Sequence, residues 1–186
     1  MTDDALLFER AFQYAESKKI RLESKDRLGH GSDGSVWKSS TPSAVKALYA
    51  SKNYIHELEC YKRLKNANVR QINGFFVPVL EGYDDSLIVI EISIVEPPYL
   101  LDFGKVYLDD PPPYHNDAQL MANAHAEWRE WFGKHWIRVA GVLRLLQKYG
   151  IYYMDPRPSN ICTGEEDDDE DGSTDWSEMP VEEEYE

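Results

Sequence analysis

Apolar residues in the first half of the chain follow two different spacings. Residues 3–19 and 52–66 carry apolar side chains near the helical repeat, in the second case Ile55, Leu58, Tyr61 and Leu64. Five short runs between and after them are rich in apolar and β-branched residues and end at turn residues, namely 21–28, 34–38, 43–49, 75–80 and 86–93. A Gly82-Tyr83-Asp84-Asp85 turn is expected between the last two. The pattern predicts two helices and five strands.

The second half of the chain has a helical pattern. Residues 117–132 are predicted as a helix with Asp117 as its cap, and Gly133 separates it from a second helix at 134–149. That second helix is apolar on most sides, which is typical of a central, buried helix. A proline-rich, irregular linker precedes the pair.

A glycine-rich stretch lies between the first two predicted strands. Gly29, Gly31 and Gly34 form a G-x-G-x-x-G pattern, and Lys46 follows on the next strand. Glycines let a backbone turn approach a polyphosphate where a Cβ would intrude. The dinucleotide-binding fingerprint has the same spacing, but it predicts a helix that opens at the third glycine. Here residues 35–38 continue as a strand, which favours a glycine turn between two strands.

This arrangement resembles the N-terminal lobe of protein kinases. There a strand lysine is held by a glutamate from a helix called αC. Glu57 in the helix 52–66 fits that role best, with Glu59 as the second choice. Further along, Asp155 and Asn160 have the aspartate-to-asparagine spacing of the kinase catalytic loop. The ordered set of motifs covers residues 21–162.

The resemblance implies ATP and Mg²⁺ as cofactors and assigns roles to individual residues. Asp155 is the expected base, Asn160 a metal ligand, and Arg157 a cation near the transferred phosphate. Lys46 and Glu57 complete the catalytic set. Ile90 is expected to be the gatekeeper residue, at the back of the pocket for the adenine base. Cofactor contacts are expected from Gly29, Gly31, Gly34, Val36, Ala44, Lys46, Ile90, Glu91 and Ser93.

Three departures from the kinase pattern bear on activity. Tyr153-Met154 replaces the histidine-arginine pair before the catalytic aspartate. Only 26 residues follow Asn160, too few for the rest of a kinase C-terminal lobe. An Asp-Phe-Gly triplet at 102–104 precedes the catalytic loop, whereas the metal-binding triplet of kinases follows it. We interpret this triplet as a coincidental turn, give Asp102 little weight, and name Asp175 as the speculative metal ligand.

The charge of the chain is concentrated at its C-terminal end. Residues 165–186 hold 13 acidic and no basic side chains, which leaves −1 for residues 1–164 out of a net charge of −14. This tail is expected to be disordered. The body shows no charge excess of a nucleic-acid-binding protein. Two cysteines, no signal-peptide pattern and no membrane-length apolar run predict a cytoplasmic protein without membrane contact.

The sequence as a whole predicts an α+β, protein-kinase-like fold: a five-stranded antiparallel N-lobe sheet with an αC helix and a minimal, mainly helical C-lobe. The expected parts are a helical extension (1–20), an N-lobe (21–96), a truncated C-lobe (97–164) and the acidic tail (165–186). The predicted function is ATP-dependent phosphate transfer to an unidentified hydroxyl. The alternative is a pseudokinase that binds nucleotide or a regulatory partner without turnover. A third reading, an acidic interaction protein of unrelated α+β fold, requires the motif order to be chance. Protein partners are expected at the acidic tail or at a Trp128/Trp131 face.

Overall fold

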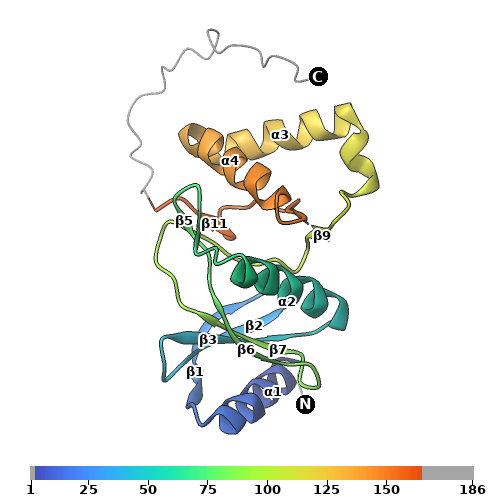
Figure 1. Ribbon diagram of the computed structural model, residues 1–186. Helices are drawn as coiled ribbons and strands as arrows, with labels where there is room; N and C mark the ends of the chain where they lie inside the picture. Colours follow the sequence, from blue (N-terminus) through green and yellow to red (C-terminus); the bar gives the residue numbers. More distant parts are fainter. Residues whose placement is uncertain (1–2, 165–186) are drawn as a thin grey trace.

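A five-stranded antiparallel sheet forms one half of the molecule in the computed structural model, which describes residues 3–164 (Figure 1). Its strands lie in the order β1-β2-β3-β7-β6, and all neighbours are antiparallel. The bounds are β1 (Leu22–His30), β2 (Gly34–Ser39), β3 (Ser43–Leu48), β6 (Leu80–Asp84) and β7 (Val89–Ser93). The mixed α+β class and the five-stranded antiparallel sheet predicted from the sequence are confirmed.

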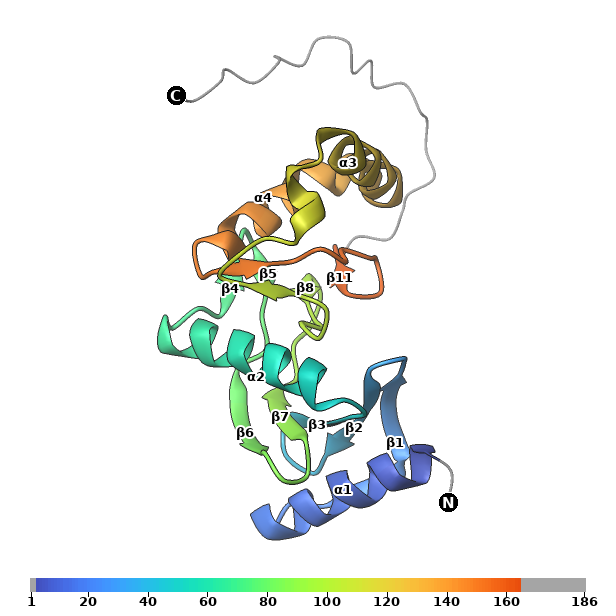
Figure 2. The same ribbon diagram turned by 90° about the vertical axis from the view of Figure 1, so that its right-hand side faces the viewer.

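Helices cover both faces of this sheet (Figures 1 and 2). Helix α1 (Asp3–Lys18) packs with Val45 and Ala47 of β3 on one face. Helix α2 (Ser51–Asn66) lies on the other face, in one apolar cluster with Ala44 and Leu48. Because successive strand residues point to opposite faces, two covered faces bury all six residues of β3. This explains why β3 has apolar residues pointing to both faces, such as Ala44 and Val45.

Two local predictions in this half are wrong. Ile55 was expected on the buried face of α2, but its exposed fraction is 58%, and Tyr54 is buried instead. The Gly82–Asp85 turn is also misplaced, because residues 82–84 continue β6 and the turn spans 85–88. Asp84 fixes that turn by accepting the backbone N–H groups of Ser86 and Leu87, each at 2.9 Å.

Helices dominate the other half of the molecule. A 3-10 turn, η1 (Pro113–Asn116), leads to α3 (Ala118–Phe132), and η2 (Gly133–His135) leads to α4 (Trp136–Gln147). Asp117 caps α3, as predicted, by accepting the N–H groups of residues 119 and 120 at 3.0 Å. Among residues 3–164, every helix is too short or too polar to span a lipid bilayer.

The tryptophans of α3 differ in exposure, which divides the expected Trp128/Trp131 face. Trp128 is buried and its ring lies 6.2 Å from that of Trp136 in α4. Trp131 remains exposed. Trp128 therefore belongs to the core between α3 and α4, and only Trp131 is available to a partner.

Six two-residue strands lie between the two halves. Figure 2 labels four of them, β4, β5, β8 and β11. Four of them form a sheet in the order β11-β8-β5-β4, made of β4 (Gln71–Ile72), β5 (Phe75–Phe76), β8 (Tyr99–Leu100) and β11 (Ile161–Cys162). The other two, β9 (Tyr107–Leu108) and β10 (Ile151–Tyr152), pair with each other. The predicted strand 75–80 is thus divided, with β5 in one sheet and β6 in another. The pairs β8·β11 and β9·β10 bring loops 101–106 and 153–160 together.

The docking of α1 depends on a buried polar contact to the sheet. Tyr14 of α1 donates its hydroxyl hydrogen to Glu91 of β7 at 2.9 Å, and Ser43 of β3 donates to the other carboxylate oxygen at 2.6 Å. Burial and the neighbouring Glu91 carboxylate raise the pKa of Tyr14, so its hydroxyl remains a donor. Each carboxylate oxygen of the buried Glu91 therefore accepts a hydrogen bond.

We predict that Tyr14→Phe lowers the free energy of unfolding by about 1–2 kcal/mol, because the buried Glu91 carboxylate loses a donor. Tyr49→Phe is the matched control at an exposed tyrosine, with a change below about 0.5 kcal/mol. Urea denaturation of the three proteins measures both values. An equal effect at Tyr14 and Tyr49 would contradict a stabilising role for this contact.

Candidate active site

A cleft of about 750 Å³ separates the sheet half from the helical half. One wall is the glycine-rich segment 28–34, where β1 turns into β2. Val36, Ala44 and Ile92 provide an apolar surface, and residues 93–95 close one side. The opposite wall comes from the loop that contains Asp102 and from the loop that contains Asp155 and Asn160.

The glycines of the turn have two different tasks. A Cβ at Gly34 would lie 2.1 Å from the Ala47 carbonyl oxygen, so β2 approaches β3 this closely only with glycine there. At Gly29 and Gly31 an added Cβ would meet no atom within 4 Å. Open space therefore lies beside these two backbone positions, which fits a turn that accommodates a polyphosphate.

Lys46 of β3 and Glu57 of α2 form a buried ion pair. The lysine Nζ lies 2.9 and 2.8 Å from the two carboxylate oxygens, and exposed fractions are 8% and 1%. The alternative partner, Glu59, instead pairs with Arg63 one helical turn later, at 3.0 Å. The short β2–β3 connection thus leaves Lys46 directly opposite Glu57.

Asp102, given little weight on sequence grounds, is the third member of this charge cluster. Its Oδ1 lies 3.2 Å from the Lys46 Nζ and accepts the Gly104 backbone N–H at 3.2 Å. The loop that contains Asp102 comes before the loop that contains Asp155 and Asn160 in the chain, yet the two loops lie side by side. The cause is strand pairing, since β8 and β9 hydrogen bond to β11 and β10 respectively.

Buried aromatic rings hold the two loops in place. Phe103 packs edge-on against Tyr61 of α2, with ring centroids 5.1 Å apart, and against Tyr153 at 5.7 Å. Tyr153 also donates its hydroxyl hydrogen to the Leu101 carbonyl at 2.8 Å. The Leu101 N–H donates in turn to the Asn160 carbonyl at 2.7 Å. Tyr153, which stands where kinases have histidine, thus links the catalytic-like loop to the Asp102 loop.

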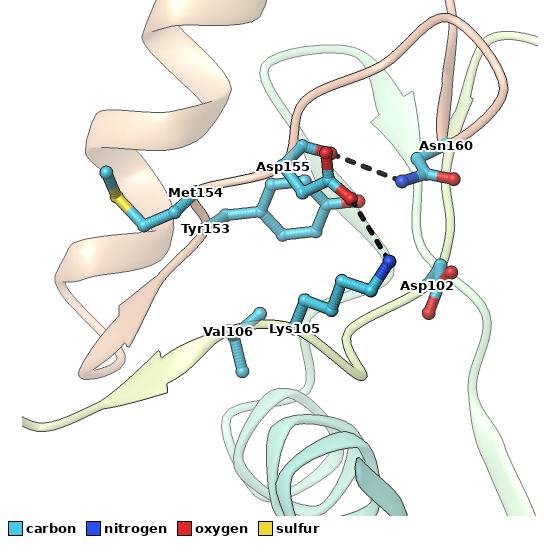
Figure 3. A pocket seen from close by; sticks show the side chains of 7 residues that line it. All are labelled: Asp102, Lys105, Val106, Tyr153, Met154, Asp155 and Asn160. Carbon is cyan, nitrogen blue, oxygen red and sulfur yellow. Dashed lines mark hydrogen bonds and ion pairs between the residues drawn. The ribbon is translucent and has the colours of Figure 1, made fainter. Parts of the chain in front are cut away.

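Asp155 and Asn160 face the same small pocket as Asp102 (Figure 3). The Asn160 amide donates to the backbone carbonyl of Asp155 at 3.2 Å, which closes the loop between them. Arg157 lies 2.6 Å from Asp155, measured from Nε to Oδ1. Lys105 approaches the other carboxylate oxygen of Asp155 at 3.9 Å.

Burial and charge shift the pKa values of the cluster in different directions. Burial alone would lower the pKa of Lys46, but the carboxylates of Glu57 and Asp102 outweigh it and the pKa is raised. Burial raises the pKa of Glu57 to about 7, against the opposing effect of Lys46. Burial also acts to raise the pKa of Asp102, yet Lys46 and the Gly104 N–H hold it below its ordinary value. Lys46 and Asp102 are charged at neutral pH.

Two of the predicted base-contacting residues do not line the cleft. Ile90 is fully buried in β7. Glu91 is paired through its backbone on both sides, with Val45 of β3 and Gly82 of β6, and its side chain faces α1. Glu91 is not among the residues that line the cleft, so the expected contact there finds no support in the structure. The residues of this segment that line the cleft are 92–95.

The other predicted site residues in the described part of the chain line one cleft: Gly29, Gly31, Gly34, Val36, Ala44, Lys46, Glu57, Ser93, Asp155, Arg157 and Asn160. Asp175 lies outside the described residues. Sequence reasoning missed Asp102, Asp33 and Lys105, which also line the cleft. The Asp-Phe-Gly triplet was the available signal for Asp102, and it was discounted on chain order alone.

Comparisons with known proteins add a partial backbone similarity. Neither the family profiles nor the curated proteins compared with this sequence give a match. Among solved structures, the chain is similar to the streptomycin–ATP–APH(2″)-IIa ternary complex, with 12% sequence identity and a TM-score of 0.39. The similarity covers 77% of this chain and 39% of that one.

We predict that Lys46→Met destabilises the protein by about 3–5 kcal/mol at pH 8, because it leaves buried Glu57 without its cation. The pKa of Glu57 is raised from 4.5 to about 7. Between pH 4.5 and about 7, Glu57 therefore carries a proton in the folded protein that it lacks in the unfolded chain. Its contribution to the stability of the protein falls as the pH rises through this range. Without Lys46 this pKa rises further, so the loss is smaller at pH 6.

Urea denaturation at pH 6 and pH 8 tests this. The double variant Lys46→Met/Glu57→Gln is the matched control, and it should recover most of the stability and remove most of the pH difference. A loss in Lys46→Met that is the same at both pH values would contradict a charged, buried Glu57.

Proposed function

We propose that the protein is an ATP-dependent phosphotransferase of the protein-kinase-like type that transfers the terminal phosphate to a hydroxyl group. One observation carries the proposal. The Lys46–Glu57 pair, Asp102, Asp155 and Asn160 line one cleft beneath a glycine-rich turn, although they come from four separate segments of the chain. This set of side chains suits the binding and transfer of a phosphoryl group.

The nucleotide would lie along the length of the cleft. Val36, Ala44 and Ile92 form the apolar surface on which an adenine ring would rest. The phosphates would follow the open side of Gly29 and Gly31 toward Lys46. At the base edge, the Ser93 and Ile94 N–H groups already donate to the Val79 and Pro42 carbonyls, so we assign the backbone contact to Val95, the next residue that lines the cleft.

Asp102 and Asn160 are the proposed metal ligands. Both line the small pocket beside Asp155, and their oxygens are the ligand type that Mg²⁺ prefers. Within residues 3–164 no group of three or more His, Cys, Asp or Glu side chains is arranged to hold a metal ion. A site with two protein ligands fits an ion that also binds phosphate oxygens. Bound Mg²⁺ would neutralise charge on the phosphates.

Asp155 is the proposed base. Its carboxylate would accept the proton of the acceptor hydroxyl while that oxygen bonds to the terminal phosphorus and ADP leaves with the bridging oxygen. Arg157, which lies against Asp155, would orient the carboxylate in the free protein. The substituted pair Tyr153-Met154 does not prevent this arrangement, because Tyr153 holds the loop through Leu101 and Phe103.

The second candidate is a nucleotide-binding or regulatory module without turnover. It is favoured by the short contact of 2.6 Å between Arg157 and Asp155, which occupies a carboxylate oxygen that a base needs. The two candidates share the nucleotide site and differ in whether Asp155 takes part in a reaction.

We predict that ATP raises the melting temperature of the protein in a Mg²⁺-dependent manner, and that Asp102→Asn removes the Mg²⁺ dependence. Asp175→Asn is the matched control, since Asp175 is the rival ligand from the sequence and should leave the shift unchanged. Thermal shift with ATP, with and without Mg²⁺, measures this. The reverse result would assign the metal to Asp175, and no shift of the unchanged protein at millimolar ATP would overturn the nucleotide site.

We predict that Asp155→Asn lowers the turnover of ATP by about 10²-fold or more while ATP binding is retained, because the base is lost and the cleft is preserved. Release of phosphate from ATP, with water as the acceptor, serves as the assay. Asp110→Asn, at an exposed acid, is the control. If the unchanged protein binds ATP and the Asp155→Asn variant is indistinguishable from it in the assay, the binding module is the correct function.

A further inference from the structure

Lys105 is a cation of the cleft lining to which no kinase-like motif assigns a role. It follows the Asp-Phe-Gly triplet and is half-exposed, at 48%. Its ammonium is 3.6 Å from Asp33 in the glycine-rich turn and 3.9 Å from Asp155 in the catalytic-like loop. It also lies 3.4 Å from the Ser32 hydroxyl. One side chain therefore contacts both walls of the cleft. Figure 3 shows its contact with Asp155.

The two carboxylates beside Lys105 face the path of a polyphosphate. Asp33 is held from behind, where the Asn53 amide of α2 donates to its Oδ1 at 2.7 Å, and only 11% of its side chain is exposed. Asp155 is 23% exposed. An anion that enters between them is repelled unless a cation lies there too.

The three cations of the cleft are held to very different degrees. Lys46 is buried between two carboxylates, and Arg157 contacts Asp155 directly at 2.6 Å. Both Lys105 pairs exceed 3.5 Å, longer than direct charge-assisted hydrogen bonds of about 2.7–2.9 Å. Arg157 and Lys105 are both exposed, at 56% and 48%, and exposed pairs contribute about 0–1 kcal/mol. Because its pairs are the longer ones, Lys105 is the cation that exchanges its partners at the lowest cost.

From this geometry we infer that Lys105 binds the terminal phosphate of the nucleotide and holds it beside Asp155. In the free protein its charge is balanced by Asp33 and Asp155. When nucleotide enters, the ammonium moves to the phosphate oxygens, and one of the two cations on Asp155 is withdrawn. The role that the sequence gave to Arg157 alone is thereby divided between Arg157 and Lys105. This inference rests on the proposed nucleotide site.

Binding of ATP and of ADP tests the inference, because only ATP carries the terminal phosphate. Isothermal titration of the full chain with each nucleotide, in the presence of Mg²⁺, compares Lys105→Met with the unchanged protein. We expect Lys105→Met to weaken ATP binding about tenfold, the loss typical of one charge-assisted hydrogen bond, and to leave ADP binding unchanged. Lys105→Arg should keep most of the ATP affinity. Lys134→Met, at an exposed lysine beyond α3, is the control.

The outcomes separate two failures. If the unchanged protein binds neither nucleotide, the proposed function fails and this inference with it. If it binds both and Lys105→Met weakens ATP and ADP equally, or neither, the nucleotide site stands and the role of Lys105 is overturned. A selective loss for ATP that Lys105→Arg does not share supports the inference.

Discussion

The structure depends most on the burial of one ammonium group between two carboxylates. Removing Lys46 and Glu57 from water costs several kcal/mol for each ion unless their geometry is close to ideal. That geometry requires β3, α2 and the Asp102 loop to meet at one point, and each element reaches it by packing. Phe103 fills the space beneath α2 next to Asp102. When Glu57 is ionised, the three groups together carry one excess negative charge, and Asp102 is the more exposed of the two carboxylates. A cation beside Asp102 would balance it.

The position of Asp102 is determined by strand pairing and is independent of chain order. Two loops carry the polar groups of the wall opposite the glycine-rich turn. One two-residue strand precedes each loop and another follows it, and the strands of one loop pair with those of the other. Antiparallel pairing places the two loops side by side whichever of them comes first in the chain. The chain leaves the Asp102 loop through β9, passes a proline-rich linker and two helices, and returns through β10. The two loops therefore contribute to one cleft although two helices separate them in the chain.

Local patterns in the sequence predicted the sheet, the helices and most of the cleft. Repeats over ten or more residues identify α1, α2 and α3, and the glycine spacing locates the turn near Lys46. The errors have specific causes. Strands such as β8 and β11 are too short to have a period, so nothing local indicates that they pair. Backbone contacts to the base were expected from Glu91 to Ser93, yet Glu91 lies within β7, between β3 and β6, and is not part of the cleft lining. Ile55 shows the limit of predicting the buried face of a helix from apolar residues alone. The buried face of α2 includes the carboxylate of Glu57 and leaves Ile55 exposed.

The cleft combines a fixed cation with an exchangeable one, and this division follows from solvent exposure. A pair of charges 4 Å apart is worth about 4 kcal/mol at an effective dielectric constant of 20 and about 1 kcal/mol in water. Lys46 is buried and loses most of its stabilisation if it leaves Glu57, so it remains in place when a ligand binds. Lys105 is half-exposed and gives up little when it leaves Asp33. A phosphate that takes Lys105 also removes positive charge from Asp155. Because the same cation lies beside Asp33 and Asp155, binding at the proposed phosphate site would change the charge around the proposed base through a single side chain, while Arg157 keeps its contact with Asp155.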